Sequence, residues 1–362
     1  MEPNRNYPIA TYVHLGPSLP KHLILGINRH RKIFPDQKIT LIVDNEIDET
    51  EFSDIDIFKV NSEVLEQDLF LEMSKYLDYD FRQNFWKFTF QRFFAIHLYH
   101  STLVNEPLLH IESDVLLLPN FPWKTFLDLG TLAWLQVNDS LDVAALVYFP
   151  NAQATQFLNS QLKEYALNEP SINDMLALRK FAIEFPEKHT YLPSRTNTTI
   201  RGNKKLSHAE KEALSRFGGI FDPLMLGLWY FGQDPKNSFG FCRRYIDDES
   251  HSLSPMKSEL TFKEKSLRMK DSTSVFSLHI HSKKLGLFGS NWSQKLEIGL
   301  KQASMRSNQV SFEWTALLKS LEGRSKREKI WQLLGAVPLF QNLRKINALE
   351  KIKDKIKRLM NP

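Results

Sequence analysis

Cysteine is almost missing from this chain of 362 residues, in which Cys242 is the only thiol. A single thiol forms no internal disulfide and cannot supply the cysteine pair of a zinc finger, so we expect a reducing compartment. No segment approaches the roughly 20 consecutive apolar residues that span a bilayer. Residues 1–10 also contain no apolar run of the kind that a signal peptide needs. The sequence therefore predicts a cytoplasmic protein that is neither exported nor membrane-spanning.

Internal repeats and low-complexity tracts are also absent from the sequence. Hydrophobic residues make up 42% of the chain and charged residues 25%, which is an ordinary composition for a globular protein. Disorder, a collagen-like repeat and a disulfide-stapled miniprotein are therefore excluded. The length suits one large domain or two medium ones.

The net charge of +5 is concentrated at the carboxyl end. Residues 322–362 hold 11 Lys and Arg against 4 Asp and Glu, whereas residues 1–321 hold 36 against 38. The basic character thus belongs to a tail, and no nucleic-acid partner is predicted. Within this tail, aliphatic residues recur every three or four positions among Lys and Arg, at Leu343, Ile346, Leu349, Ile352, Ile356 and Leu359. The pattern predicts a basic amphipathic helix, which suits an anionic membrane surface, an acidic partner or packing against the rest of the chain.

Strand and helix patterns alternate through residues 9–60. Ile9–Leu15 and Lys38–Val43 are rich in β-branched and apolar residues, and Ser18–Phe34 between them has apolar residues at helical spacing. Continuously apolar strands are typical of a parallel sheet covered on both faces, so the sequence predicts an α/β fold. The other expected elements are strands at Ile55–Val60, Pro107–Leu118, Leu132–Val137, Val143–Phe149 and Val275–His281, and helices at Asn84–His100 and Ala152–Tyr165.

Two carboxylates interrupt the apolar strand predicted at Pro107–Leu118: Glu112 and Asp114, separated by Ser113. On an extended segment, side chains two residues apart point to the same face. Two ionised carboxylates on one face repel each other and are costly to bury, unless a cation lies between them. Oxygen ligands of this kind suit Mg²⁺ or Mn²⁺. The alternative is a pair that caps a turn at the end of a strand and faces water.

The same spacing of acidic residues occurs at four other places, which are Glu46/Asp48, Asp54/Asp56, Glu66/Asp68 and Asp78/Asp80. Three of these pairs have polar or charged surroundings, whereas Glu112 and Asp114 are flanked by apolar residues on both sides. The pair Glu46/Asp48 follows a predicted strand and is a competing candidate.

The segment His110–Leu118, together with Arg92 upstream of it, resembles a known family. It is similar to the Arg helix and the Asp-X-Asp strand of nucleotide-sugar-dependent glycosyltransferases with the GT-A fold, in particular bacterial and glycogenin-like members. Their strand reads approximately Tyr-Leu-Asp-X-Asp, and this chain departs from it by having Glu at position 112. The resemblance covers residues 9–290 and implies a Rossmann-like mixed sheet flanked by helices, followed here by a helical carboxyl-terminal extension.

This resemblance implies a set of roles around a divalent cation, Mn²⁺ or Mg²⁺. Asp114 would be the principal metal ligand, and Glu112 would contact the ribose of the nucleotide or reach the metal through water. A histidine late in the chain completes the metal site in such enzymes, and the candidates here are His279 and His281, with Lys283 as a phosphate contact. The alternative for this segment is a strand with one packed and one exposed histidine.

Three further residues are candidates for catalytic roles: Arg92, Asp174 and Asp222. A buried guanidinium needs partners, so we expect Arg92 near the metal site, paired with a motif carboxylate, in contact with the donor, or in a purely structural ion pair. Asp174 resembles the acidic segment that borders the transferred sugar and the acceptor in these enzymes, and its alternative role is a helix cap. Asp222 lies in a glycine- and aromatic-rich segment, residues 218–235, that is either an acceptor-site loop or a packed turn.

Three residues are predicted nucleotide contacts because of their position alone. Thr11 and Tyr12 lie near the end of the first strand, and Asp44 follows the second. Open α/β sheets bind nucleotides at the carboxyl ends of such strands.

The predicted organisation is a GT-A glycosyltransferase domain at residues 1–321 and a helical tail at residues 322–362. The predicted function is transfer of a sugar from a nucleoside-diphosphate sugar to a glycan, a lipid-linked sugar or a protein, in polysaccharide biosynthesis, with the tail holding the enzyme at the inner face of the membrane. Two alternatives are open: a non-catalytic scaffold of the same fold at a membrane, and a sugar nucleotidyltransferase. The second class carries an N-terminal Gly-rich loop with a basic residue, whereas residues 14–22 offer a single glycine.

Overall fold

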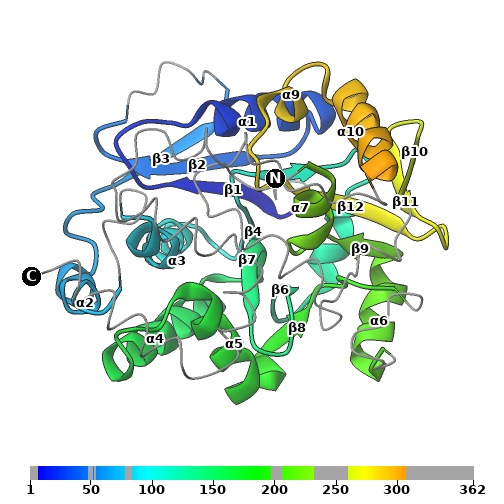
Figure 1. Ribbon diagram of the computed structural model, residues 1–362. Coiled ribbons are helices and arrows are strands. Elements are labelled where there is room, and N and C mark those ends of the chain that lie inside the picture. Colours follow the sequence, from blue (N-terminus) through cyan, green and yellow to red (C-terminus); the bar gives the residue numbers. More distant parts are fainter. Residues whose placement is uncertain are drawn as a thin grey trace, which may run out of the picture.

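The structure, a computed structural model, describes residues 7–47, 52, 54–77, 84–196, 206–231 and 260–306. Two sheets form its framework (Figure 1). Three predictions fall wholly or partly outside the described residues: the helical tail at 322–362, the last part of the glycine-rich segment at 232–235, and Asp48 of the competing acidic pair.

The larger sheet contains seven of the described strands. They span Ile9–His14 (β1), Ile39–Asp44 (β2), Asp56–Val60 (β3), Leu108–Ile111 (β4), Leu132–Gln136 (β6), Asp142–Phe149 (β7) and His189–Tyr191 (β8). Their order is β3-β2-β1-β4-β7-β6-β8. The first four run parallel, β7 is antiparallel to both β4 and β6, and β8 is parallel to β6. The carboxyl ends of β1, β2, β4, β6 and β8 therefore lie along one edge.

Helices cover both faces of the larger sheet (Figure 1). The helical elements are Lys21–Ile33 (α1), Gln67–Met73 (α2), Phe85–Ser101 (α3), Trp123–Asp128 (η1, a 3₁₀ helix), Ala152–Asn168 (α4), Asp174–Glu184 (α5), Pro186–Lys188 (η2, a 3₁₀ helix), His208–Phe217 (α6), Met225–Phe231 (α7), Leu285–Phe288 (α9) and Trp292–Arg306 (α10). Residues of α3, α4 and α5 share one core cluster with Ile42 and Leu108. Residues of α1 and η1 share another with the adjacent Leu41 and Leu109, so neighbouring strand residues are both buried. None of the described helices is both long and apolar enough to cross a membrane.

A smaller sheet lies beside the larger one. Its strands are Val115–Leu117 (β5), Gly219–Phe221 (β9), Leu260–Lys263 (β10), Ser266–Met269 (β11) and Ser274–His279 (β12). Their order is β10-β11-β12-β5, and β9 pairs in parallel with β12. Residues of α7, α9 and α10 form a third core cluster with this sheet. The expected α/β fold, with a mixed sheet flanked by helices, is thus confirmed.

The prediction of a single strand at Pro107–Leu118 is wrong. β4 ends at Ile111 in the larger sheet and β5 begins at Val115 in the smaller one. The residues between them form a turn in which the Val115 N–H donates to the Glu112 carbonyl over 3.0 Å. Both strands are buried and apolar, so the sequence pattern does not show that they belong to different sheets. The strand predicted to reach His281 likewise ends earlier, at His279.

Candidate metal and nucleotide site

The acidic turn, Glu112-Ser113-Asp114, joins the two sheets at the carboxyl end of β4. The N–H of its first residue donates to the Ala145 carbonyl in β7 over 3.0 Å, and the Ile280 N–H donates to the carbonyl of its last residue over 2.7 Å. Its serine Oγ lies 3.2 Å from Nε2 of His22 in α1. The two carboxylates thus converge through a turn held by three parts of the fold, and not through the side-chain alternation of a strand.

His279 is the histidine whose imidazole meets both carboxylates. β12 pairs antiparallel with β5, and this register places His279 opposite Val115, next to the acidic turn. The Nε2 atom of His279 lies 3.3 Å from Asp114 Oδ1 and 3.4 Å from Glu112 Oε2. The ring of His281 stacks on the ring of His279, with centroids 4.4 Å apart. The two candidate histidines therefore lie together, with His279 against the carboxylates.

Glu112, Asp114 and His279 fit a divalent cation. One ligand atom from each residue lies within 4.8 Å of the ligand atoms of the other two. Metal ligands lie about 2 Å from the ion, so only small side-chain shifts separate this arrangement from coordination. Two carboxylates and one imidazole suit Mn²⁺, and the carboxylates also suit Mg²⁺. Within the described part of the chain this is the one group of three acidic or histidine residues with such spacing.

Mutual attraction controls the protonation of this group. Burial alone would raise the pKa of Asp114, but the positive charges of His279 and Lys283 outweigh it and hold that pKa well below its usual range. Lys283 Nζ lies 3.7 Å from Asp114 Oδ2. Burial alone would lower the pKa of His279, but Asp114 and then Glu112 outweigh it and raise that pKa to about 9. The site thus concentrates negative charge and draws cationic groups to it.

Arg92 links the acidic turn to α5. Its guanidinium pairs with Glu112 through Nη1 and with Asp174 through Nη2. Although burial works against a charged guanidinium, these two carboxylates raise the pKa of Arg92. Burial raises the pKa of Asp174, and Arg92 opposes that rise. Of the partners expected for Arg92, the structure shows a motif carboxylate together with a second acidic side chain.

The first turn of α5 explains how Asp174 reaches Arg92. Asn173 is the N-cap of the helix, and its side chain accepts a hydrogen bond from the Leu176 N–H over 3.0 Å. Because Asn173 supplies the cap, the carboxylate of Asp174 turns inward, where its side chain is only 4% exposed. The helix-cap role considered for this segment therefore falls on Asn173 and not on Asp174.

Asp222 is fully buried and does not face solvent. Its carboxylate accepts four backbone hydrogen bonds, from the N–H groups of Leu224, Leu226, Gly227 and His279. Burial raises the pKa of Asp222, and these hydrogen bonds oppose the rise. The expected contact with an acceptor is replaced by a contact with the backbone of the candidate metal ligand. The sequence gives no sign of this, because the two residues are 57 positions apart.

The three residues predicted at the nucleotide edge have mixed surroundings. Thr11 is fully buried, and its carbonyl lies 3.1 Å from His110 Nδ1. Tyr12 is also buried, and its hydroxyl lies 2.8 Å from Nδ1 of His30 in α1. Their side chains thus pack in the core instead of lining the edge. Asp44 ends β2 and is partly exposed, with its carboxylate accepting a hydrogen bond from Ser62.

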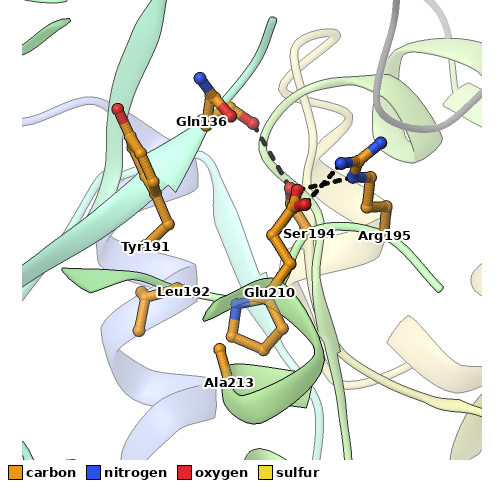
Figure 2. A pocket seen from close by; sticks show the side chains of 8 residues that line it. Gln136, Tyr191, Leu192, Ser194, Arg195, Glu210 and Ala213 are labelled. Atoms are coloured by element: carbon orange, nitrogen blue, oxygen red, sulfur yellow. Dashed lines mark hydrogen bonds and ion pairs between the residues drawn. The ribbon is translucent and has the colours of Figure 1, made fainter. Parts of the chain in front are cut away.

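A small pocket with a mixed polar and apolar lining lies further along the same edge (Figure 2). β6 ends there at Gln136 and β8 at Tyr191, which are two and three strands away from β4. At the usual strand spacing these separations are about 10 and 14 Å. Arg195 donates two hydrogen bonds to Glu210, over 2.7 and 2.6 Å. No catalytic or metal-binding pattern in the sequence marks this pocket. The local signal near it is the Ser-x-x-Glu spacing of the capping box that begins α6.

No family model matches the chain, and no curated protein matches it. Among solved structures it is similar to the galactosyltransferase LgtC in complex with donor and acceptor sugar analogues, at 12% identity and a TM-score of 0.39, over 84% of this chain and 98% of that one. Mouse xyloside xylosyltransferase 1 in its apo form has 11% identity and a TM-score of 0.33, over 53% and 86%. The bifunctional glycosyltransferase WbbM has 10% identity and a TM-score of 0.35, over 71% and 52%. The description of the fold therefore rests on the order and pairing of the strands.

Proposed function

We propose that this chain is a metal-dependent glycosyltransferase that moves a sugar from a nucleoside-diphosphate sugar to a glycan, lipid-linked or protein acceptor. The observation that carries the proposal is the meeting of Glu112, Asp114 and His279 at the carboxyl end of β4. Open α/β sheets bind nucleotides at this edge. A candidate cation site beside such an edge supports a reaction in which a nucleoside diphosphate is the leaving group.

The three ligands would hold a divalent cation that stabilises the negative charge developing on the diphosphate leaving group. Lys283 supports the same role, because its ammonium group lies on the Asp114 side of the cluster. Lysine binds phosphate as a flexible point charge. In this proposal Lys283 exchanges its contact with Asp114 for a phosphate oxygen when the donor binds.

Arg92 and Asp174 would shape the sugar side of the site. Arg92 engages one oxygen of Glu112, which leaves the other oxygen directed at His279. The same guanidinium holds Asp174 beside the acidic turn. We therefore place Asp174 next to the transferred sugar and give Arg92 the task of orienting both carboxylates.

The acceptor would approach along the edge formed by the ends of β6 and β8. The pocket there offers the side chains of Gln136 and Ser194 next to the Arg195–Glu210 ion pair (Figure 2). Amide, hydroxyl and charged groups of this kind are suited to sugar hydroxyls. For a lipid-linked acceptor, attachment of residues 322–362 to an anionic membrane would keep enzyme and substrate on one surface, a role that the sequence pattern of the tail supports.

The test uses the full-length chain with Mn²⁺ and either uridine or guanosine diphosphate. We expect a nucleotide-dependent rise in melting temperature that requires the metal, followed by slow hydrolysis of at least one nucleotide sugar in a panel. Nucleotide binding without hydrolysis or transfer would favour the scaffold. Failure of both nucleotides to stabilise the chain in the presence of Mn²⁺ would overturn the proposal.

A further inference from the structure

The carboxylate of Asp222 ties two separate elements together. Its Oδ1 accepts the N–H groups of Leu224 and Leu226 over 3.1 and 2.9 Å, at the start of α7. Its Oδ2 accepts the Gly227 N–H over 2.7 Å and, from β12, the His279 N–H over 3.0 Å. One oxygen therefore serves the helix alone, and the other bridges the helix to the candidate metal ligand.

The next residue controls the ring of the same histidine. The Pro223 carbonyl lies 2.9 Å from His279 Nδ1, so it accepts a hydrogen bond when that nitrogen carries a proton. The other ring nitrogen, Nε2, then faces Asp114 and Glu112. Backbone and imidazole of His279 are thus both fixed by two consecutive residues.

Gly227 allows α7 to approach this close. A Cβ atom at that position would lie 1.9 Å from the His279 carbonyl oxygen and 3.2 Å from Asp222 Oδ2. No side chain fits there without moving the helix away from β12. The short distance shows that α7 is seated directly on the backbone of His279.

We propose that Asp222 is a positioning residue for His279, which through the Asp222–Gly227 segment holds Nε2 at the metal site; this inference rests on the proposed function. Residues that orient a metal-ligating histidine fix the ring nitrogen that meets the ion, and their loss typically lowers metal affinity about 10- to 100-fold. Asp222 touches neither substrate nor metal in this proposal. It acts through the position of His279.

The decisive variant is Asp222→Ser. A serine hydroxyl at position 222 can still accept from the Leu224 N–H two residues on. It is too short to bridge to β12. We expect a loss of Mn²⁺ affinity of about 10- to 100-fold, measured from free Mn²⁺ by electron paramagnetic resonance. We also expect faster hydrogen exchange at the His279 amide in the metal-free protein, because that N–H loses its acceptor. Asp222→Asn is the second variant: it keeps the shape of the side chain but turns an amide group toward one pair of N–H donors.

The matched control is Asp142→Asn, which alters another fully buried aspartate that contacts Trp134 and Tyr191 instead of His279. Mn²⁺ affinity should stay within about twofold there, because no ligand of the cation is disturbed. If folded Asp222→Ser keeps wild-type Mn²⁺ affinity and a protected His279 amide, the inference is overturned. It is also overturned if folded Asp222→Asn exposes the His279 amide to faster exchange and yet keeps wild-type Mn²⁺ affinity. A wild-type chain that binds no Mn²⁺ refutes the proposed function, and the exchange of the His279 amide still decides whether Asp222 positions it.

Discussion

Two buried clusters of charge lie near the carboxyl edge of the larger sheet, and they are built differently. The first gathers three carboxylates and three cationic side chains, namely Glu112, Asp114, Asp174, Arg92, His279 and Lys283. The second contains a single carboxylate, Asp142, that accepts hydrogen bonds from Trp134 Nε1 and the Tyr191 hydroxyl, each over 2.9 Å.

The difference separates a structural carboxylate from the carboxylates of a candidate ligand site. The side chain of Asp142 is fully buried, with two neutral hydrogen-bond donors and the Arg179 guanidinium 4.0 Å away, so it stabilises the fold and leaves no oxygen facing solvent. The side chains of Glu112 and Asp114 are 17% and 13% exposed, and each has a second carboxylate close by. Crowded like charges that still reach solvent gain free energy from a bound cation. Crowding together with partial exposure, and not burial alone, marks the candidate site.

The largest loss of stability is expected from Arg92→Met. This change leaves Glu112 and Asp174 buried without the partner that they share. Breaking a buried ion pair in this way costs about 3–5 kcal/mol. Urea unfolding measures the loss. The matched variant Arg179→Met should cost less, about 1 kcal/mol, because its guanidinium lies 4.0 Å from Asp142, which keeps the hydrogen bonds from Trp134 and Tyr191. Equal losses would remove the distinction between the clusters.

Substitution of aspartate by asparagine is expected to change nucleotide binding in one cluster and stability in the other. Asp114→Asn should weaken Mn²⁺-dependent nucleotide binding by more than about 100-fold, since even outer partners of metal ligands are worth 10- to 100-fold. Asp142→Asn should leave that binding intact and cost about 1 kcal/mol of stability, because the hydrogen bonds from Trp134 and Tyr191 lose their ionised acceptor. Titration calorimetry and urea unfolding of both variants provide the comparison. Unchanged nucleotide affinity in Asp114→Asn would remove this residue from the metal site.

Lowering the pH should reduce the free energy of unfolding through His189, next to the Asp142 cluster. His189 packs on Trp134 with ring centroids 3.9 Å apart. Burial, with a smaller contribution from Arg179, lowers the pKa of His189 to about 3. Between pH 6.5 and 3 the unfolded chain therefore binds one more proton than the folded chain. Stability should fall as the pH drops through this window, by up to about 1.4 kcal/mol per pH unit. Urea unfolding at pH 7, 6 and 5 tests this, and His189→Phe should flatten the slope by up to one proton.

The smallest effect on either cluster is expected from deletion of residues 322–362. Each Lys or Arg near an anionic surface contributes about 1 kcal/mol, so the deletion should abolish binding to anionic liposomes at low salt. Hydrolysis of the nucleotide sugar in solution should be largely retained. If the full-length chain does not bind such liposomes, or if the truncated chain unfolds, the tail is instead part of the packing of the domain.

Much of the larger sheet was predictable because its strands are buried on both faces. β1 and β2 read as continuous apolar runs, and the helix between them has apolar residues at helical spacing. The smaller sheet was not predictable in the same way. β5 and β9 have three residues each, and their pairing with β12 joins segments far apart in the sequence.

The candidate site also has one part that the sequence predicts and another part that it does not. Its acidic pair stands out because carboxylates interrupt an apolar run, and this signal is local. The place of His279 against the carboxylates depends on the register of β12 against β5, which sequence spacing does not contain. Asp222 reads as a loop residue because its role depends on backbone N–H groups, which carry no sequence signature.

The acidic turn is also a mechanical joint. It is the link through which the chain leaves the larger sheet at β4 and enters the smaller one at β5. His279 comes from the smaller sheet, whereas Asp174 comes from α5, which packs against the larger sheet. A cation bound at this turn would cross-link the two sheets. Separation of the sheets would then require its release, so bound metal would suppress partial opening and raise the force at which the two sheets come apart.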